Sequence, residues 1–424
     1  MMHKKVLIIA YYFPPMGLSG VQRTVKFTKY LPEYGWNPLV LTSTPSSYYA
    51  FDDSLLQEFE NKEIKIFRTA PKNPVSDETK QKKEVKFPSY FKQKLGRAFL
   101  QTIHQPDSIV KWKKAAVELG EKIIRDNGID AIFATAPPFT DFLIADELSK
   151  KFNLPFLVDY RDVWVDNPFH FYATPFHKNY AAKLEAGILT YAQKIIVTTR
   201  RTKELILKRY KFVANEDIII IPQGFDLEDF KDADKIKPNS EKFTITHSGL
   251  FQDNRSPEYF LKAISKLVKN NPDIAKRLQA RFVGIMRKDH LKMIKKYNLQ
   301  DNVLCTGYIS HQEAINQLLE SDVLWLMLND KVRSPGKLYE YFGAAKPLLV
   351  SCPDGVIRRT ALDSNAAIAT DPKDVESIEE AITTYFKLWK SKHLPSPNPS
   401  YIHQFDRRRL TGFLATELSR AAEL

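Results

Sequence analysis

Cysteine and long apolar runs are both scarce in this chain of 424 residues. Its only two cysteines, Cys305 and Cys352, lie in apolar stretches, which indicates buried thiols in a reducing compartment and no disulfide framework. No apolar run approaches the roughly 20 residues that a helix needs to cross a bilayer. The apolar residues 6–9 continue into Tyr11-Tyr-Phe-Pro-Pro without a cleavage site for a signal peptide, so they predict a buried first strand. We therefore expect a cytoplasmic protein.

Sequence patterns for several kinds of chemistry are also missing. The nine histidines form no pair at the spacing of a helical metal site, and the one Asp-x-Asp, Asp232 and Asp234, lies in a lysine-flanked linker. There is no nucleophile elbow and no P-loop. The first strand lacks a G-x-G-x-x-G sequence after it and the second ends in Leu41-Thr-Ser, which argues against an NAD-dependent enzyme. We expect neither a metal nor a bound cofactor.

Acidic residues are fewer than basic ones, 50 against 63, and the net charge of +13 favours an anionic partner. Residues 80–97 hold six lysines, one arginine and one glutamate, interleaved with Phe87, Tyr90, Phe91 and Leu95. This composition favours contact with an anionic membrane surface, although a solvated loop remains an alternative. No nucleic-acid-binding motif accompanies the charge, so nucleic acid is not an expected partner.

Short apolar runs alternate with helical patterns along the chain, which predicts an α/β fold of parallel sheets covered on both faces. The polar residues 224–241 form the expected linker. We predict two Rossmann-like, doubly wound domains over 1–225 and 226–400, facing a central cleft. The strands are expected at 6–10, 38–42, 129–135, 155–159, 194–198, 243–247, 280–283, 302–306, 323–328, 347–351 and 367–369. Ligands of such sheets bind at the carboxyl ends of strands, so the motifs there are the candidates for a site.

Two motifs follow strands of the first half. Gly17 and Gly20 allow close approach of a ligand, and the helix that starts there offers free N–H groups, although an ordinary turn is the alternative. Asp159 and Asp162 follow an apolar run and can orient an acceptor hydroxyl or take its proton. The alternative is a structural network in which Arg161 bridges the two acids.

Two further motifs follow strands of the second half. Gly249 ends the strand at 243–247, and Arg255, just before the next helix, could stabilise charge on a leaving diphosphate, or could simply be exposed. In 334–340, Ser334 is expected to cap a helix that begins at Pro335. Lys337 at that helix start can hold a phosphate, and Glu340 can accept hydrogen bonds from a ribose diol. A surface ion pair between Lys337 and Glu340 is the alternative.

In these motifs and their order, the chain resembles the GT-B glycosyltransferases of family 4 over nearly its whole length. The motifs are Pro-Pro-x-Gly-x-x-Gly at 14–20, residues 159–164, Ile-Pro-Gln-Gly-Phe-Asp at 221–226, His247-Ser-Gly with Arg255, Gly-Tyr-Ile-Ser-His at 307–311, and residues 335–340. The resemblance implies hexosyl transfer from a nucleoside-diphosphate sugar, with retained anomeric configuration and without a metal.

The resemblance also implies roles for single residues. Glu340 would hold the donor ribose, Arg255 the donor phosphates, and Gly17 and Gly20 would lie beside the diphosphate. The last helix, 402–424, would pack back on the first domain. The predicted sites are therefore catalytic residues Asp159, Asp162 and Arg255, donor-binding residues Gly17, Gly20, Gly249, Arg255, Lys337 and Glu340, and acceptor-binding residues Arg161 and Trp164. The expected acceptor is a glycan or a lipid-linked saccharide of polysaccharide assembly, reached from the inner face of the membrane.

The chain departs from the family pattern at three points. The family often has Glu-x7-Glu, but Val332 stands eight residues before Glu340. The lysine that commonly follows the arginine is replaced by Ser256-Pro-Glu-Tyr, and Ile-Pro-Asn-Gly is altered at Gln223. These changes leave the identity of the donor sugar and its nucleotide undetermined. Three alternative functions also remain: a nucleotide-sugar epimerase of the same fold, a non-catalytic scaffold, and a basic nucleic-acid binder.

Overall fold

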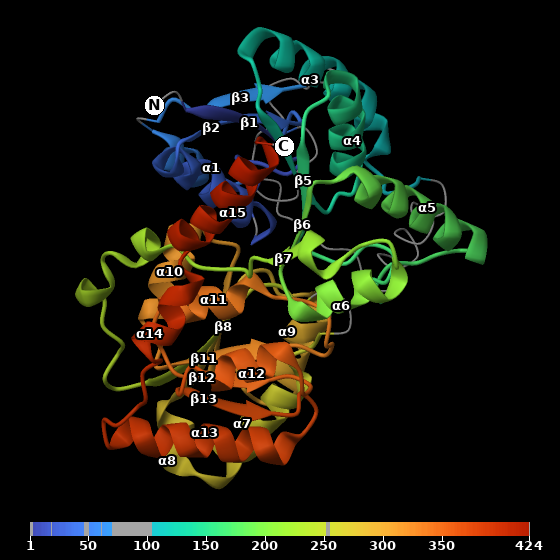
Figure 1. Ribbon diagram of the computed structural model, residues 1–424. Coiled ribbons are helices and arrows are strands. Elements are labelled where there is room, and N and C mark those ends of the chain that lie inside the picture. The colour runs from blue at the N-terminus through green and yellow to red at the C-terminus, as the bar shows by residue number, and fades with distance from the viewer. Residues whose placement is uncertain are drawn as a thin grey trace, which may run out of the picture. The chain divides into compact units, whose positions relative to one another are not determined.

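The computed structural model describes residues 3–17, 19–45, 51–60, 62–69, 104–251 and 255–423. The chain divides into two compact units (Figure 1): a first unit of Met1–Gln223 with Arg407–Leu424, and a second unit of Gly224–Asp406. The division lies two residues before the position expected from the sequence, and the chain returns to the first unit at Arg407. Residues 80–97, where a membrane contact is predicted, lie outside the described residues.

The first unit is built on a sheet of seven strands in the order β3-β2-β1-β4-β5-β6-β7, in which every paired strand is parallel to its neighbours. The five strands predicted for this half are confirmed, with ends that shift by no more than two residues, whereas the edge strands β3 and β7 were not predicted. The strands are β1 (Lys4–Ile9), β2 (Trp36–Thr42), β3 (Lys65–Arg68), β4 (Ala131–Ala136), β5 (Phe156–Tyr160), β6 (Lys194–Val197) and β7 (Ile218–Ile220).

Helices cover both faces of this sheet because its strands are apolar on both sides. Leu7 and Ile9 of β1 contribute to one core, while the alternate residues Val6 and Ile8 contribute to the other. The helices are α1 (Ser19–Tyr30), α3 (Lys113–Asn127), α4 (Thr140–Phe152), α5 (Pro175–Tyr191), α6 (Arg200–Arg209) and α15 (Arg407–Ala421). Helices α3, α4 and α5 pack in the first core, and α1 packs with α15 in the second. The last helix therefore completes a core of the first unit.

The second unit contains a six-stranded parallel sheet in the order β10-β9-β8-β11-β12-β13. All six strands were predicted: β8 (Phe243–Ser248), β9 (Leu278–Val283), β10 (Val303–Gly307), β11 (Val323–Met327), β12 (Leu348–Ser351) and β13 (Ala367–Thr370). The strand order reverses between β8 and β11, as it does between β1 and β4 in the first unit. Such a switch point is where open α/β sheets bind ligands. This confirms the predicted class of two Rossmann-like sheets.

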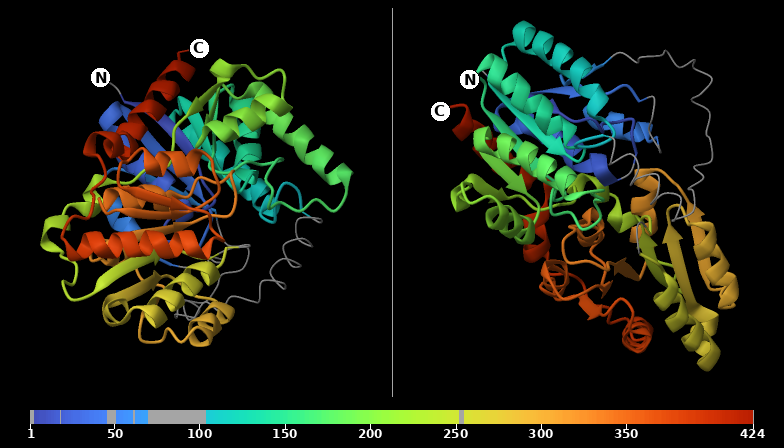
Figure 2. Two further views of the ribbon diagram at one scale, coloured as in Figure 1. Left: turned by 90° about the horizontal axis from the view of Figure 1, so that it is seen from below. Right: turned by 90° about the vertical axis from the view of Figure 1, so that its right-hand side faces the viewer.

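The helices of the second unit lie on both faces of its sheet, as the views in Figure 2 show. They are α7 (Glu258–Asn270), α8 (Pro272–Arg277), α9 (Lys288–Lys296), α10 (His311–Leu319), α11 (Gly336–Gly343), α12 (Val356–Leu362), α13 (Val375–Lys390) and α14 (Pro399–Ile402). Trp325 of β11 stacks on Phe260 of α7, with ring centres 3.9 Å apart, at the centre of one core. Among the described residues, no helix is both long and apolar enough to span a bilayer.

Two helix starts of the second unit differ in their caps, and the predicted Ser334 cap is wrong. Ser310 and Glu313 form a capping box at α10. Helix α11, however, begins at Gly336 with Pro335 as its N-cap, and no side chain caps it. The Ser334 hydroxyl instead lies buried without a hydrogen-bond partner. The reason is that Pro335 is held in an extended conformation, which moves the start of the helix one residue beyond Ser334's reach.

Candidate functional site

Three glycines end adjacent strands at the carboxyl edge of the second sheet. Gly249, Gly284 and Gly307 follow or end β8, β9 and β10, and their φ angles of 134°, 126° and 73° fall in the region that favours glycine. The Gly249 N–H donates to Val283 O at 2.8 Å and the Gly284 N–H to Gly307 O at 3.0 Å. A Cβ atom at Gly284 would lie 2.9 Å from the Gly249 carbonyl oxygen. The glycines thus let the backbones at the ends of β8 and β9 approach each other closely.

His247 lies buried at the same edge. Its Nδ1–H donates to the Trp325 carbonyl at 3.0 Å, whereas Nε2 has no hydrogen-bond partner. Burial, together with the charges of Arg255 and Lys337, lowers the pKa of His247 to about 3, so the imidazole is neutral. Both cations are therefore near enough to the buried ring to lower its pKa, and Lys337 also contacts this edge, with its Cγ 3.9 Å from the position of a Cβ on Gly249. His247 was not predicted as a site residue.

Lys337 and Glu340 project from the first turns of α11. The Lys337 ammonium lies 2.5 Å from a Glu340 carboxylate oxygen, and the two side chains are 23% and 11% exposed. The ion pair considered as an alternative therefore exists, and it lies at the strand edge. Tyr341 fixes this helix because its hydroxyl accepts from the Ser248 N–H at 2.8 Å and donates to Trp325 O at 3.3 Å. The start of α11 is thereby tied to β8 and β11.

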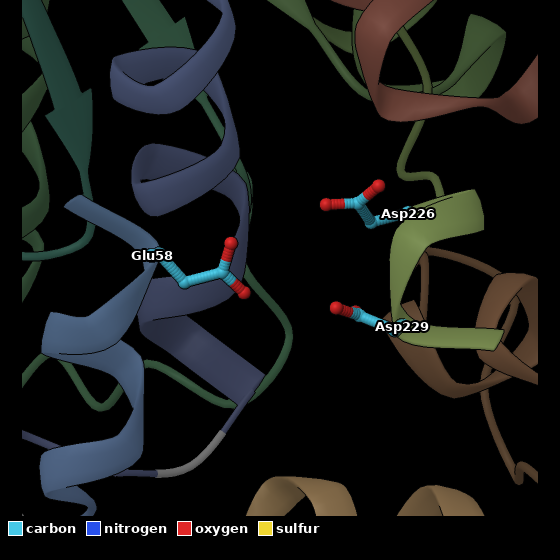
Figure 3. A group of neighbouring side chains, drawn as sticks. All are labelled: Glu58, Asp226 and Asp229. Carbon is cyan, nitrogen blue, oxygen red and sulfur yellow. The ribbon is translucent and has the colours of Figure 1, made fainter. Parts of the chain in front are cut away.

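A second charged pair adjoins Glu340 in the same unit. His311, the first residue of α10, lies 3.1 Å from Asp229 of the 3-10 helix Leu227–Phe230. Burial alone would lower the pKa of His311, but the hydrogen bond to Asp229 and the charges of Asp229 and Glu340 outweigh it and raise the pKa. Figure 3 shows Asp229 beside Asp226, whose carboxylate accepts from the Glu228 N–H at 3.0 Å and so caps this short helix.

Figure 3 also draws Glu58, which belongs to the first unit. There its carboxylate pairs with Lys26 at 2.5 Å and Lys29 at 2.6 Å. Taken within either unit alone, the described residues bring together no group of three His, Cys, Asp or Glu ligand atoms. We assign no metal site.

At the carboxyl edge of the first sheet, Asp159 is fully buried and fully engaged. Arg23 of α1 donates to its two oxygens at 2.8 and 2.9 Å, and the Thr135 hydroxyl donates at 2.8 Å. Arg23 also donates to the carbonyls of Ile221 and Pro222 at 3.0 and 2.8 Å. A structural network therefore exists, but its cation is Arg23 and not Arg161. With no exposed surface, Asp159 is placed to hold the fold and not to touch an acceptor.

The other predicted residues of this edge have different surroundings. Arg161 donates to the carbonyls of Gly20 and Pro137, so it fastens the glycine loop to the turn after β4. Trp164 is fully buried and stacks on Phe139, with ring centres 4.6 Å apart, which gives it a packing role in place of the predicted acceptor contact. Gly17 is buried and Gly20 is exposed. Asp162 keeps part of its surface exposed.

Each unit thus gathers its own set of predicted residues. The second unit brings Gly249, Arg255, Lys337 and Glu340 to one edge, while the first brings Gly20 and Arg161 together. Sequence reasoning missed Arg23, Gly284 and His247 as important residues. Gly284 follows a predicted strand directly, which was an available signal; Arg23 lies on the apolar side of α1, where only the folded structure reveals its partner.

Two family models match the chain. One, described as Glycosyltransferase Family 4, matches residues 20–229, and the other, described as Glycosyl transferases group 1, matches residues 228–398. Protein CapJ of Staphylococcus aureus is 24% identical over 289 residues, which are 67% of this chain and 69% of CapJ. Together the two family matches extend over most of both units.

Solved structures share the fold at low identity. Sucrose-phosphate synthase of Thermosynechococcus elongatus superposes with a TM-score of 0.64, 16% identity and 98% coverage of both chains. HepE of Anabaena, solved in complex with UDP and glucose, superposes with a TM-score of 0.64 and 14% identity, over 99% of this chain and 100% of HepE.

Proposed function

Because the chain belongs to the glycosyltransferases of group 1 and family 4 and has their GT-B type of fold, we propose that it transfers a hexosyl group from a nucleoside-diphosphate sugar to a glycan or lipid-linked acceptor. The observation that carries this proposal is the carboxyl edge of the second sheet. There the pair of Lys337 and Glu340 adjoins Gly249, and the charges of Lys337 and Arg255 both act on His247. The similar fold of HepE, which was solved with UDP and glucose, supports a nucleotide sugar as the donor.

The ion pair of Lys337 and Glu340 is suited to exchange partners with such a donor. The Lys337 ammonium at the start of α11 is offered to a phosphate, together with the N–H groups of the first helical turn. The Glu340 carboxylate, released from the lysine, accepts hydrogen bonds from the ribose diol. In the ligand-free pair each charge neutralises the other, so neither is left unpaired where solvent access is restricted.

We propose that Arg255, with Lys337, stabilises the negative charge that grows on the leaving diphosphate. These two cations supply the charge that a metal ion supplies elsewhere, so the proposed transfer needs no metal and no other cofactor. The proposed retention of anomeric configuration follows from the family resemblance.

The first unit is proposed to receive the acceptor. Asp162 is the carboxylate of this edge that keeps exposed surface, so we propose that it orients the acceptor hydroxyl. Asp159 and Arg161 act as positioning residues beneath it. The basic and aromatic composition of residues 80–97 supports an acceptor at an anionic membrane, as in the assembly of surface polysaccharides, with the enzyme on the cytoplasmic face.

The donor site can be tested with a panel of nucleotide sugars, first by the change in melting temperature and then by binding affinity from calorimetry. The cognate donor should raise the melting temperature of the wild type, because it binds only the folded form. Glu340→Ala and Arg255→Ala should each weaken binding by roughly 10- to 100-fold, the value of a lost charge-assisted hydrogen bond. Glu376→Ala on α13, which removes an exposed carboxylate, is the matched control and should bind normally.

Near-normal affinity in both site variants would remove the donor-site assignment. Incubation of the bound donor with and without candidate acceptors then separates the alternatives. A transferase needs the acceptor to move the sugar, an epimerase alters the donor alone, and a scaffold leaves the donor intact.

A further inference from the structure

Helix α5 carries an exposed row of aromatic side chains along one line. Phe176 is 83% exposed, Tyr180 53% and Tyr191 56%, and Lys183 and Gly187 occupy the exposed positions between them. Steps of three or four residues keep all five on one face of a helix. The loop that leads into α5 adds Phe171, which is 46% exposed.

The opposite face of α5 makes the packing contacts. Ala181, Ile188 and Leu189 are buried in the core of the first unit, and α5 lies at the outside of that unit (Figure 1). The aromatic row is therefore not a core face, and no described residue of the first unit covers it to the point of burial. Exposed aromatic surface of this kind marks a site of interaction.

The charge that α5 exposes on this face has one sign. The only acidic residue of α5, Glu185, is buried and accepts a hydrogen bond from Tyr210 at 2.8 Å. Lys183 is exposed, and the Lys150 ammonium, which pairs with Asp146 at 2.8 Å, lies 4.3 Å from the centre of the Tyr191 ring. The row thus combines aromatic rings with the cation of Lys183, and its helix exposes no carboxylate.

We propose that this face, the aromatic row of α5 with Lys183, is a contact surface for an anionic lipid bilayer. Tyr and Phe rings are favoured at the boundary between headgroups and acyl chains, and lysines lie in the headgroup layer with their stems on apolar surface. Each cation near an anionic leaflet adds attraction that salt screens. A helix of 17 residues extends about 25 Å, long enough to lie along the surface.

The sign of the charge favours a bilayer over a second copy of the chain. Two copies that met through this face would bring lysines against lysines with no exposed carboxylate of α5 to compensate. The inference goes beyond the proposed function and does not depend on donor chemistry. The inference places a membrane contact on α5, separate from the one that the sequence predicts at residues 80–97.

Flotation of the full-length protein with vesicles tests the proposal. Vesicles of phosphatidylcholine with phosphatidylglycerol should bind the wild type, and vesicles of phosphatidylcholine alone should bind it far less. The double variant Phe176→Ser/Tyr180→Ser and the variant Lys183→Glu should each weaken binding to anionic vesicles by roughly tenfold or more. The matched controls are Phe413→Ser, which removes an exposed ring of α15, and Lys122→Glu, which reverses an exposed charge of α3. Both controls should bind like the wild type.

Four outcomes would overturn the proposal: no binding of the wild type to either vesicle, equal binding to both vesicles, unchanged binding of the α5 variants, or equal losses in the controls. Charge reversal of Lys82 and Lys83 provides a further arm. If it abolishes binding while the α5 variants bind normally, the contact belongs to 80–97 and the proposal fails. Nucleotide-sugar binding by the same variants shows that they are folded, and its persistence separates this surface from the donor site.

Discussion

The carboxyl edges of the two sheets share a topology but use their charged side chains differently. In the first unit, Asp159 and Arg23 are 0% and 1% exposed, and their hydrogen bonds go to neighbouring protein groups. In the second unit, Lys337 keeps 23% of its side chain in solvent beside Gly249 and pairs with Glu340, which is 11% exposed. The first edge therefore uses charge to hold elements together, and the second keeps charge available to a ligand. The two edges are distinguished by how deeply these charged side chains are buried and by how many protein groups they bind.

The largest expected effect comes from breaking the buried pair of the first edge. Asp159→Ala leaves the Arg23 guanidinium buried without its partner and should lower the free energy of unfolding by about 3–5 kcal/mol, measured by urea denaturation. The double variant Arg23→Met/Asp159→Ala should be more stable than the sum of the single changes predicts, because no charge is then left unpaired. A loss below about 1 kcal/mol in the single variant would show that this edge does not depend on the pair.

A smaller effect is expected from crowding the glycines of the second edge. Gly284→Ala forces a side chain into a left-handed conformation and against the Gly249 backbone, and should cost about 2–4 kcal/mol together with much of the donor affinity. Gly307→Ala is the control, because its φ of 73° is also positive but nothing lies within 4 Å of the added Cβ. It should cost about 1 kcal/mol. Equal costs for the two variants would mean that the close approach of the backbones is unimportant.

The first unit should also depend on pH through Glu185. Burial raises the pKa of Glu185 from 4.5 to about 7, so the folded protein holds this proton over a range in which the unfolded chain releases it. The contribution of Glu185 to stability is therefore fully present below about pH 4.5 and is lost as the pH rises to about 7. Glu185→Gln removes this dependence. Relative to wild type, it should gain on the order of 2 kcal/mol between pH 5 and pH 8, measured by urea denaturation at each pH. A constant difference between the two proteins would contradict the assignment.

The smallest effect on stability is expected at the pair of the second edge. Lys337→Met should lower the free energy of unfolding by about 1–2 kcal/mol, less than Asp159→Ala does, because it leaves the buried Glu340 carboxylate without its cation but at the margin of solvent. The same change should weaken nucleotide-sugar binding by roughly tenfold, measured by calorimetry. If it destabilises the protein as much as Asp159→Ala does and leaves binding intact, the contrast between the two edges disappears.

The sequence predicted the strands that carry continuous apolar runs, because a parallel strand buried on both faces has that pattern. It missed β3, whose four residues begin and end with Lys65 and Arg68, and β7, which has only three residues. Both lie at sheet edges, where short strands are held by one neighbour and leave little signal.

The candidate site was predictable where chemistry is local. Lys337 and Glu340 are one helical turn apart, so their pairing could be anticipated from spacing. The partner of Asp159 could not, because Arg23 lies 136 residues away and competes with the nearer Arg161, which binds backbone carbonyls instead. The need for glycine at position 284 likewise could not be predicted, because it comes from the Gly249 backbone at the end of β8.

The return of α15 to the first unit has a consequence for biosynthesis. Leu410, Leu414 and Leu418 complete a core whose other members, including Val21 and Val25, are translated almost four hundred residues earlier. Until that helix emerges from the ribosome, the apolar residues of the amino-terminal unit that α15 covers remain exposed to chaperones and proteases. A premature stop codon shortly before Arg407 would therefore harm the half of the enzyme that the ribosome made first.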